Sequence, residues 1–344
     1  MLHRIKLLLK KKGLIRIIWN VMTKIRRGQK VYEYILGKYG EKCKIYVGQH
    51  PGTGDVYIQA MFLQEIVSSS EEKYVFTVIG SAASKIAHIW GIKTIECLSL
   101  QQSNDLISYA RFMTRIKRLN IDILHYHPME YFYDAYLGYL RNYRGLNFFK
   151  MMSLAVFNHN GVYPSSLPKF EANIEKIRNL NKKYHLIPGK TVLLAPYANS
   201  LNMLPMEFWI KLAKKLNNLG YRVCTNSFGK DEPIIEGTCG LALEYNDLIA
   251  FLEQAGAVIS LRSGLSDCIS SAKCKKIILY PKQQLYEIMG GIGSSKDYFS
   301  LNNMKLCDDA IEYEIDFSNT KELKKVIKKI ITYFQEPTED SLAN

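Results

Sequence analysis

The sequence predicts an α/β fold with two doubly wound domains, each built on a parallel sheet, and a basic helix at the amino end. Apolar runs rich in β-branched residues alternate with helical patterns along most of the 344 residues, and this alternation is typical of parallel sheets. It stops near residue 165 and begins again near residue 189. A chain of this length can build two cores of ordinary size.

The first domain is expected over residues 31–165 and the second over 189–335, with a charged linker helix at 166–188 and a disordered tail at 336–344. In the first domain, strands are predicted at 42–48, 74–79, 94–100 and 121–128, and helices follow each of them, the last two at 104–119 and 129–145. In the second domain, strands are predicted at 191–198, 221–229, 255–262 and 275–282, and helices at 205–220, 246–255, 265–274 and 321–335.

Residues 1–30 carry most of the net charge of +14. They hold ten basic side chains and no acidic one, which leaves a net charge of +4 on the other 314 residues. Because the basic charge is confined to one arm, nucleic acid is not expected as a partner. Apolar residues and Trp19 alternate with the cations at roughly helical spacing, which favours a helix lying on anionic lipid. The alternative is a helix packed on its own domain with a solvated basic face.

The seven cysteines form no C-x-x-C pair, which favours a reducing compartment and excludes the common zinc motifs;. No apolar run approaches the roughly 18–20 residues that would span a bilayer. We therefore expect a cytoplasmic protein that lies on the inner face of the membrane. No metal and no cofactor are expected.

In the first domain, the stretch GQHPGTGDVYIQA follows the first strand and opens the first helix. Gly52 and Gly54 allow a tight turn there. Asp55 falls near the start of the helix, at the edge of the sheet where ligands bind. Its carboxylate can act as a general base towards a hydroxyl, or it can cap the helix. Position alone does not separate these two interpretations.

His125 and His127 lie two residues apart near the end of a predicted strand, so their side chains share one face;. They are candidates for contacting a sugar or orienting a reacting hydroxyl, with His127 as the catalytic candidate. Hydrogen-bonded structural histidines are the alternative. The tyrosines that follow at 131–139 have mixed helical spacing, which favours packing.

Two loops of the second domain follow predicted strands and are candidates for holding an anionic ligand. The loop APYANSLNMLP contributes Tyr197, Asn199 and Asn202. The stretch SLRSGLSD contributes Arg262, whose guanidinium offers two parallel donors to phosphate oxygens. The residues Ser263, Gly264, Leu265 and Ser266 stand at the start of the next helix, where backbone N–H groups attract anions. Asp267 is expected either to cap that helix or to hold Arg262. The alternative is a surface loop with an incidental salt bridge, and the glycine-rich 289–299 is a weaker third candidate.

These stretches resemble the heptosyltransferase-like glycosyltransferases. GTGDVYIQA is similar to that family's G-D-V helix start, and APYANSLNMLPMEFW is similar to its loop before a P-x-x-W helix. The resemblance covers roughly residues 44–335 and implies the GT-B fold of two Rossmann-like domains. It also implies a metal-independent enzyme that inverts the anomeric centre, with Asp55 as the general base and the nucleotide sugar held mostly by the second domain.

The sequence departs from the family pattern at the donor loops. The family's lysine before the P-x-x-W helix is replaced by Asn202 or Met203. Arg262 stands where the family has an aspartate, and Asp267 stands where it has a histidine. Because acid and base are exchanged, the resemblance implies a donor other than ADP-heptose, such as a GDP- or UDP-linked hexose or deoxyhexose.

The expected function is transfer of a sugar from a nucleotide-sugar donor to a membrane-associated glycan, such as a capsule, lipopolysaccharide or lipid-linked oligosaccharide. The expected partners are that donor, that acceptor and, through residues 1–30, an anionic membrane surface. Two alternatives remain. One is a nucleotide-sugar 2-epimerase of the same two-domain shape, and the other is a non-catalytic protein bound to the membrane surface by the arm.

Overall fold

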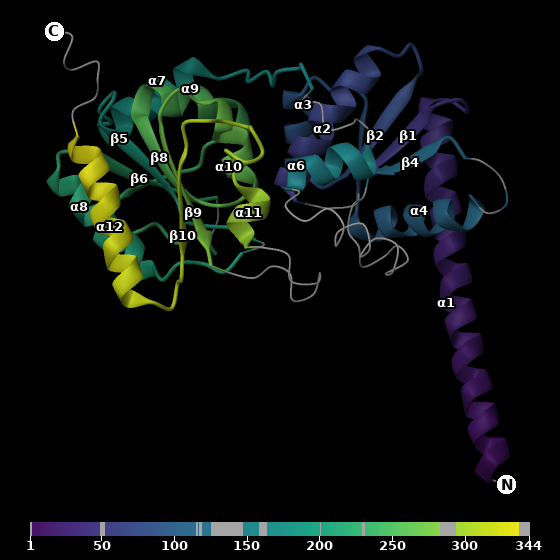
Figure 1. Ribbon diagram of the computed structural model, residues 1–344. Coiled ribbons are helices and arrows are strands. Elements are labelled where there is room, and N and C mark those ends of the chain that lie inside the picture. The colour runs from purple at the N-terminus through teal and green to yellow at the C-terminus, as the bar shows by residue number, and fades with distance from the viewer. Residues whose placement is uncertain are drawn as a thin grey trace. The chain divides into compact units, whose positions relative to one another are not determined.

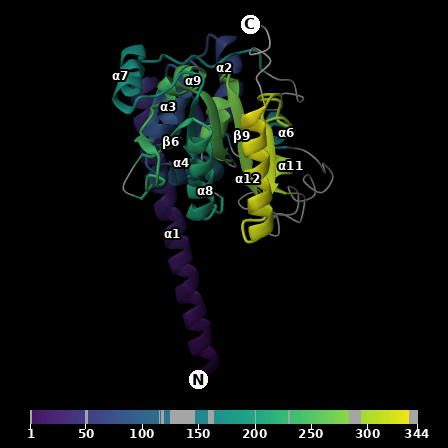
Figure 2. The ribbon, with the colours of Figure 1, turned by 90° about the vertical axis from the view of Figure 1, so that its left-hand side faces the viewer.

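The structure is a computed structural model, drawn as a ribbon in Figures 1 and 2. It describes residues 2–48, 52–114, 116, 119–124, 147–157, 164–199, 201–228, 231–282 and 294–336. The chain divides into two compact units. Unit 1 comprises residues 1–125 and 163–168, and unit 2 comprises residues 126–162 and 169–344.

Unit 1 contains a four-stranded sheet in the order β3-β2-β1-β4, in which every pairing is parallel. Tyr57 of α2 packs against Trp90, which ends α3, with 5.0 Å between the ring centroids. The opposite face is covered by α4, where Leu106 and Ile107 pack with Ile45 of β1. The elements are β1 (Lys44–Gly48), α2 (Thr53–Ser68), β2 (Tyr74–Ile79), α3 (Ser81–Ile89), β3 (Ile95–Leu98), α4 (Leu100–Met113) and β4 (Ile121–Leu124).

Helix α1 (Leu2–Tyr39) precedes this sheet and runs without a break over 38 residues, about 57 Å at 1.5 Å per residue;. Ile25 and Ile35 are buried in its carboxyl-terminal part, which packs on α4 and the sheet. Its amino-terminal part extends away from the rest of unit 1, as both ribbon views show. The basic helix predicted over residues 1–30 thus extends to Tyr39, and its carboxyl-terminal part packs on the domain, as the alternative interpretation expected.

Two sets of polar contacts fix α1 to unit 1. Arg27 donates from Nε and Nη2 to the two carboxylate oxygens of Asp105 on α4, at 2.7 and 3.2 Å. Beside it, a Cβ on Gly28 would overlap the Asp105 carbonyl oxygen, so the two helices cross in backbone contact. Nearer the end of α1, Lys38 and Tyr39 each donate to Glu96 Oε2 at 2.7 Å. The helix is thus held at two points, by groups of opposite charge and by close packing.

Unit 2 contains a six-stranded parallel sheet in the order β10-β9-β8-β5-β6-β7. Its central strand TVLLA is buried on both faces: Leu194 packs under Phe208 and Trp209 of α8, and Leu193 packs under Phe251 of α9. The strands are β5 (Thr191–Ala195), β6 (Arg222–Asn226), β7 (Cys239–Leu241), β8 (Gly256–Leu261), β9 (Lys275–Pro281) and β10 (Ile311–Ile315). The helices are α7 (Ile174–Tyr184), α8 (Met206–Asn218), α9 (Tyr245–Ala255), α10 (Gly264–Cys268) with a 3₁₀ turn η2 (Ile269–Ser271), α11 (Ser295–Phe299) and α12 (Thr320–Gln335).

One segment expected in the first domain belongs to unit 2. Helix α6 (Phe148–Met151) and the π-helical turn η1 (Met152–Val156) lie before the predicted boundary at residue 165. The ring of Phe148 packs between Tyr298 and Phe299 of α11, with centroids 5.9 and 5.5 Å away. Asn147 donates from its side-chain amide to the Asn303 carbonyl at 2.5 Å. Aromatic burial against α11 is the reason that this segment leaves the first domain.

The eight predicted strands are confirmed and correspond to β1 to β6, β8 and β9. The sequence pattern did not predict the remaining two strands, β7 and β10. The predicted helix at 129–145 lies outside the described residues. Within the described part of the chain, no helix is both long and apolar enough to cross a membrane.

Candidate functional site

In unit 2, the two candidate loops follow adjacent strands at the point where the strand order reverses. Strands β5, β6 and β7 run outwards to one side, and β8, β9 and β10 run outwards to the other. Ala195 of β5 pairs in register with Ser260 of β8. The loops after these two strands therefore leave the sheet side by side. In open parallel sheets this reversal opens a crevice at the carboxyl ends of the strands, and ligands bind there.

Unit 1 has the same kind of reversal, between β1 and β4. Gly48, the last residue of β1, pairs in register with Leu124, the last residue of β4. Gly54 and Asp55 follow β1 and stand in the first turn of α2. The other two candidates of this domain, His125 and His127, lie outside the described residues. The sequence therefore placed its candidates after strands that flank a reversal in both units.

Asp55 is the third residue of α2, not its cap. The cap is Gly52, which has extended backbone angles (φ −67°, ψ 126°). A Cβ on Gly52 would overlap Asp55 Oδ2, so the carboxylate folds back over the residue that starts the helix. Asp55 and its neighbours from Gly52 onwards are partly exposed. The positive end of the helix dipole favours the ionised carboxylate, which is the form that a general base requires.

Gln59, one turn further along α2, was missed by sequence reasoning. Its side chain is fully buried and donates from Nε2 to the Leu124 carbonyl of β4 at 2.8 Å. It thereby ties the helix that carries Asp55 to the neighbouring strand at the reversal. Gly48 leaves room for it, because a Cβ there would lie 3.1 Å from Gln59 Oε1. The available signal was one amide inside the apolar run DVYIQAMFL.

Arg262 was expected to offer its guanidinium to a diphosphate, and the structure places that group in the interior. The residue is 5% exposed. Nη2 donates to Asp267 Oδ1 at 2.7 Å, and Nη1 donates to Oδ2 at 3.1 Å. Of the two roles expected for Asp267, the structure therefore shows the one in which it holds Arg262. Nε donates to the Phe299 carbonyl at 2.9 Å, and Nη1 also contacts the Ser263 carbonyl. The picture of a guanidinium open towards phosphate is therefore corrected, since its nitrogens already have acceptors within the protein.

The same interior cluster continues behind Arg262. Tyr280 donates to Glu312 Oε1 at 2.6 Å, and Ser300 donates to Glu312 Oε2 at 2.5 Å. Burial and the neighbouring Glu312 carboxylate raise the pKa of Tyr280, although Arg262 opposes the shift. Burial lowers the pKa of Arg262, but the Asp267 carboxylate outweighs it, so the net shift is upwards. Arg262 is therefore a fixed cation that joins the loop after β8 to α11.

The remaining candidates of unit 2 are better exposed. Asn199 and Asn202 are exposed, and Tyr197 is half-buried with its hydroxyl donating to the Pro233 carbonyl. Ser263 and the next two residues are also half-buried, whereas Ser266 is buried beneath them. The Ser263 N–H donates to Ser266 Oγ at 3.2 Å, which closes the turn. Gly264 and Leu265 supply backbone N–H groups at the start of α10.

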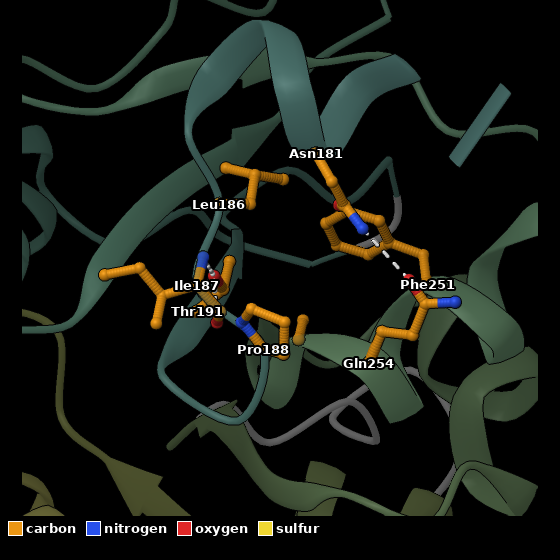
Figure 3. Close-up of a pocket in the computed structure, with 8 residues that line it drawn as sticks. Asn181, Leu186, Ile187, Pro188, Thr191, Phe251 and Gln254 are labelled. Atoms are coloured by element: carbon orange, nitrogen blue, oxygen red, sulfur yellow. Dashed lines mark hydrogen bonds between the residues drawn. The ribbon is translucent and has the colours of Figure 1, made fainter. Parts of the chain in front are cut away.

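The small pocket in Figure 3 lies at the other edge of the same sheet. It is lined by Ile187, Thr191 and Gln254, among others, and Thr191 begins β5. Its volume of about 10 Å³ accommodates about one water molecule;. The Thr191 hydroxyl donates to the Ile187 carbonyl at 2.8 Å, which closes a structural turn. This pocket is too small for a sugar or a nucleotide.

Among the residues that the structure describes, no group of three or more His, Cys, Asp or Glu side chains is placed to hold a metal ion. No family model matches the sequence, and none of the curated proteins matches it either.

Solved structures do share its fold. An ADP-heptose lipopolysaccharide heptosyltransferase II from E. coli superposes with a TM-score of 0.53 and 13% identity, covering 85% of this chain and 100% of that one. A family 9 glycosyl transferase from Veillonella parvula gives 0.52 and 13%, covering 84% and 89%. The chain has the fold of these glycosyltransferases. At such low identity the likeness is one of fold, and it confirms the expected pair of Rossmann-like domains on parallel sheets.

Proposed function

We propose that the protein is an inverting glycosyltransferase that moves a sugar from a nucleotide-sugar donor to a membrane-associated glycan, such as a capsule, lipopolysaccharide or lipid-linked oligosaccharide. One observation carries the proposal: in a fold shared with two glycosyltransferases, the candidate residues of both units follow strands that flank a reversal of strand order. The E. coli protein of the same fold is an ADP-heptose heptosyltransferase, which supports a nucleotide sugar as the donor class.

The proposed reaction is a direct displacement. An acceptor hydroxyl gives its proton to the Asp55 carboxylate while its oxygen attacks the anomeric carbon. The bond from that carbon to the diphosphate oxygen breaks, and its electron pair leaves with the nucleoside diphosphate. We assign donor binding to the exposed loop that holds Tyr197, Asn199 and Asn202, and to the backbone N–H groups after Ser263. Preorganised donors of this kind stabilise the charge that grows on the leaving group.

In this scheme Arg262 supports the donor loop through Asp267 and the Phe299 carbonyl, as its hydrogen bonds indicate. His127 and His125 stay proposals as acceptor-side groups. The protein is proposed to need no metal and no cofactor, and to use a GDP- or UDP-linked hexose or deoxyhexose in place of ADP-heptose. We also propose that it acts from the cytoplasmic side, held at the anionic inner surface of the membrane by its amino-terminal arm.

The first experiment is a thermal-shift panel of nucleoside diphosphates and nucleotide sugars. A ligand at about 100 times its Kd stabilises the folded protein by about 2.7 kcal/mol, so a true donor stands out. The donor so identified is then used to compare Asp55→Asn with the unchanged protein in a transfer assay. The asparagine cannot accept the proton, so we expect turnover to fall by about 10²- to 10⁴-fold with donor binding retained.

The matched control is Glu71→Gln, which removes an exposed carboxylate of the same unit in the turn before the amino end of β2, whereas Asp55 follows the carboxyl end of β1. It should leave turnover unchanged. Normal turnover by Asp55→Asn would remove Asp55 from the mechanism. Conversion of the donor to an epimer without any acceptor would favour the nucleotide-sugar 2-epimerase. Absence of any shift across the panel would favour a non-catalytic surface-binding protein.

A further inference from the structure

Helix α1 changes its surroundings abruptly between residues 22 and 25. Ile18, Trp19, Val21 and Met22 are 53%, 67%, 50% and 40% exposed, whereas Ile25 is 7% exposed. Trp19 is also unlike the other two tryptophans, Trp90 and Trp209, which are buried. Four large apolar side chains within five residues of one helix are thus left in solvent.

The exposed residues continue the face that unit 1 buries. Ile18, Val21, Met22 and Ile25 are spaced i, i+3, i+4 and i+7, which places them in one stripe along the helix. Further along, the same stripe includes Gly28, at the crossing with α4, where a Cβ would lie 2.6 Å from the Tyr109 Cβ. The apolar stripe is therefore longer than the domain that covers it. The exposed residues of the stripe precede Ile25, the first buried one, and the amino-terminal part of α1 extends away from the rest of unit 1 in both ribbon views.

The charge of the extending segment favours an anionic surface as its partner. Residues 2–22 contain no acidic side chain. Their six cations are Arg4, Lys6, Lys10, Lys11, Lys12 and Arg16. A second copy of the arm would bring the same positive charges together, which opposes pairing. An anionic lipid surface attracts them, with about 1 kcal/mol for each cation near it. Tryptophan is moreover enriched at the boundary between headgroups and acyl chains.

We propose that residues 2–22 of α1 form a membrane-binding segment that inserts the Ile18–Val21–Met22 face and Trp19 into the headgroup boundary of an anionic bilayer. Residues 23–39 then hold unit 1 on the same continuous helix, through Arg27 and Asp105 and through the contacts of Glu96. The inference rests on the membrane placement proposed above and narrows it from residues 1–30 to one face of residues 2–22. Its tests do not use the transfer reaction.

The native Trp19 reports on insertion. The full chain is titrated with vesicles of phosphatidylcholine alone and with vesicles that contain phosphatidylglycerol. We expect a blue shift of tryptophan emission, and quenching by brominated acyl chains, only with the anionic vesicles. Trp19→Phe should abolish both signals, because Trp90 and Trp209 are buried and do not change surroundings. Equal signals from the Trp19→Phe protein would overturn the proposed insertion.

A pair of variants tests whether the Ile18–Val21–Met22 face of α1 is the one that contacts the bilayer. Ile18→Asp places a charge in the proposed boundary, and Asn20→Asp adds the same charge at an exposed residue on the opposite side of the helix;. We expect Ile18→Asp to weaken binding to anionic vesicles roughly tenfold more than Asn20→Asp, which corresponds to about 1.4 kcal/mol. Equal weakening would mean attraction by charge alone and would overturn the assigned face. A dimer that Ile18→Asp dissociates, without loss of vesicle binding, would overturn lipid as the occupant.

The nucleotide-sugar thermal shift is measured on the same variants. Failure of vesicle binding with a normal thermal shift removes this inference and leaves the transferase standing. Vesicle binding of the unchanged protein without any nucleotide-sugar shift removes the transferase and supports this inference.

Discussion

Each unit places a charged residue after a strand that flanks its reversal of strand order, and the two residues differ in their surroundings. In unit 1, Asp55 follows β1 beside a strand reversal and its carboxylate is partly exposed in the first turn of α2. In unit 2, Arg262 follows β8 beside a strand reversal and is buried against Asp267. Strand ends beside a reversal thus carry a partly exposed carboxylate in unit 1 and a buried cation that holds loops together in unit 2. Position at a sheet edge therefore marks a residue as a candidate, and the partners of its side chain distinguish support of the fold from exposure to solvent.

Removing the partner of the buried cation should have the largest effect. In Asp267→Ala the Arg262 guanidinium stays in the interior without its carboxylate. Breaking a buried ion pair in this way costs about 3–5 kcal/mol. We expect the free energy of unfolding of unit 2 to fall by that amount in urea titrations. A loss below about 1 kcal/mol would contradict the pairing, and the double variant Arg262→Met with Asp267→Leu should recover part of the loss.

Arg262→Lys tests whether Arg262 supports the loop after β8 or contacts the diphosphate of the donor directly. Lysine cannot reach two carboxylate oxygens and the Phe299 carbonyl together, so the loop after β8 should loosen. We expect affinity for the nucleoside and for the nucleoside diphosphate to fall by the same factor, as measured by calorimetry. A loss confined to the diphosphate would instead mean that the guanidinium grips phosphate in the bound state.

A pH titration probes Glu96, one of the buried acids of unit 1. Burial alone would raise the pKa of Glu96, but the hydrogen bonds from Lys38 and Tyr39 outweigh it and lower the pKa below its ordinary value of 4.5. Because the folded pKa is the lower one, the stabilisation is present above about pH 4.5 and is lost as the pH falls through the folded pKa. Lys38 is 47% exposed, so we expect Glu96→Gln to cost only about 1 kcal/mol at pH 7;. The difference from the unchanged protein should shrink as the pH falls through the folded pKa of Glu96, and a constant difference would contradict the role of the charge.

A comparably small effect on stability is expected for Tyr197→Phe, in the loop after β5 of unit 2. It removes one hydroxyl that donates to the Pro233 carbonyl. Such a hydrogen bond contributes about 0.5–1.5 kcal/mol to stability. If Tyr197 also contacts the donor, affinity for the nucleotide sugar falls in addition, and thermal shifts with and without donor separate the two effects.

The strands that the sequence predicted are those with long apolar runs. The two that it missed lie at the edges of the larger sheet. Strand β7 has only three residues, too few for a pattern. Strand β10 reads IEYEI, in which acidic residues interrupt the apolar ones. Its Glu312 is accommodated because Tyr280, Ser300 and the Leu301 N–H donate to it, and these partners come from segments distant in sequence.

The sequence predicted the candidate residues, and the structure decides between the alternatives for only some of them. Asp267 as the holder of Arg262 was one of two expectations for that residue, and the structure decides between them. The burial of Arg262 depends on the Phe299 carbonyl, which nothing in SLRSGLSD indicates. Likewise, helical periodicity in the arm is the same for the packed and the exposed turns. The boundary between the packed and the exposed turns of α1 lies where its contacts with α4 end, and it therefore depends on tertiary structure.

The close crossing at Gly28 gives the arm its direction. Because the α1 backbone rests on the Asp105 carbonyl and the Tyr109 Cβ, a single methyl group at position 28 would pry the two helices apart. Because α1 is one continuous helix, a small tilt at this crossing would displace its amino-terminal end by many ångströms. The direction in which the amino-terminal part of α1 extends therefore depends on the absence of a Cβ atom at position 28.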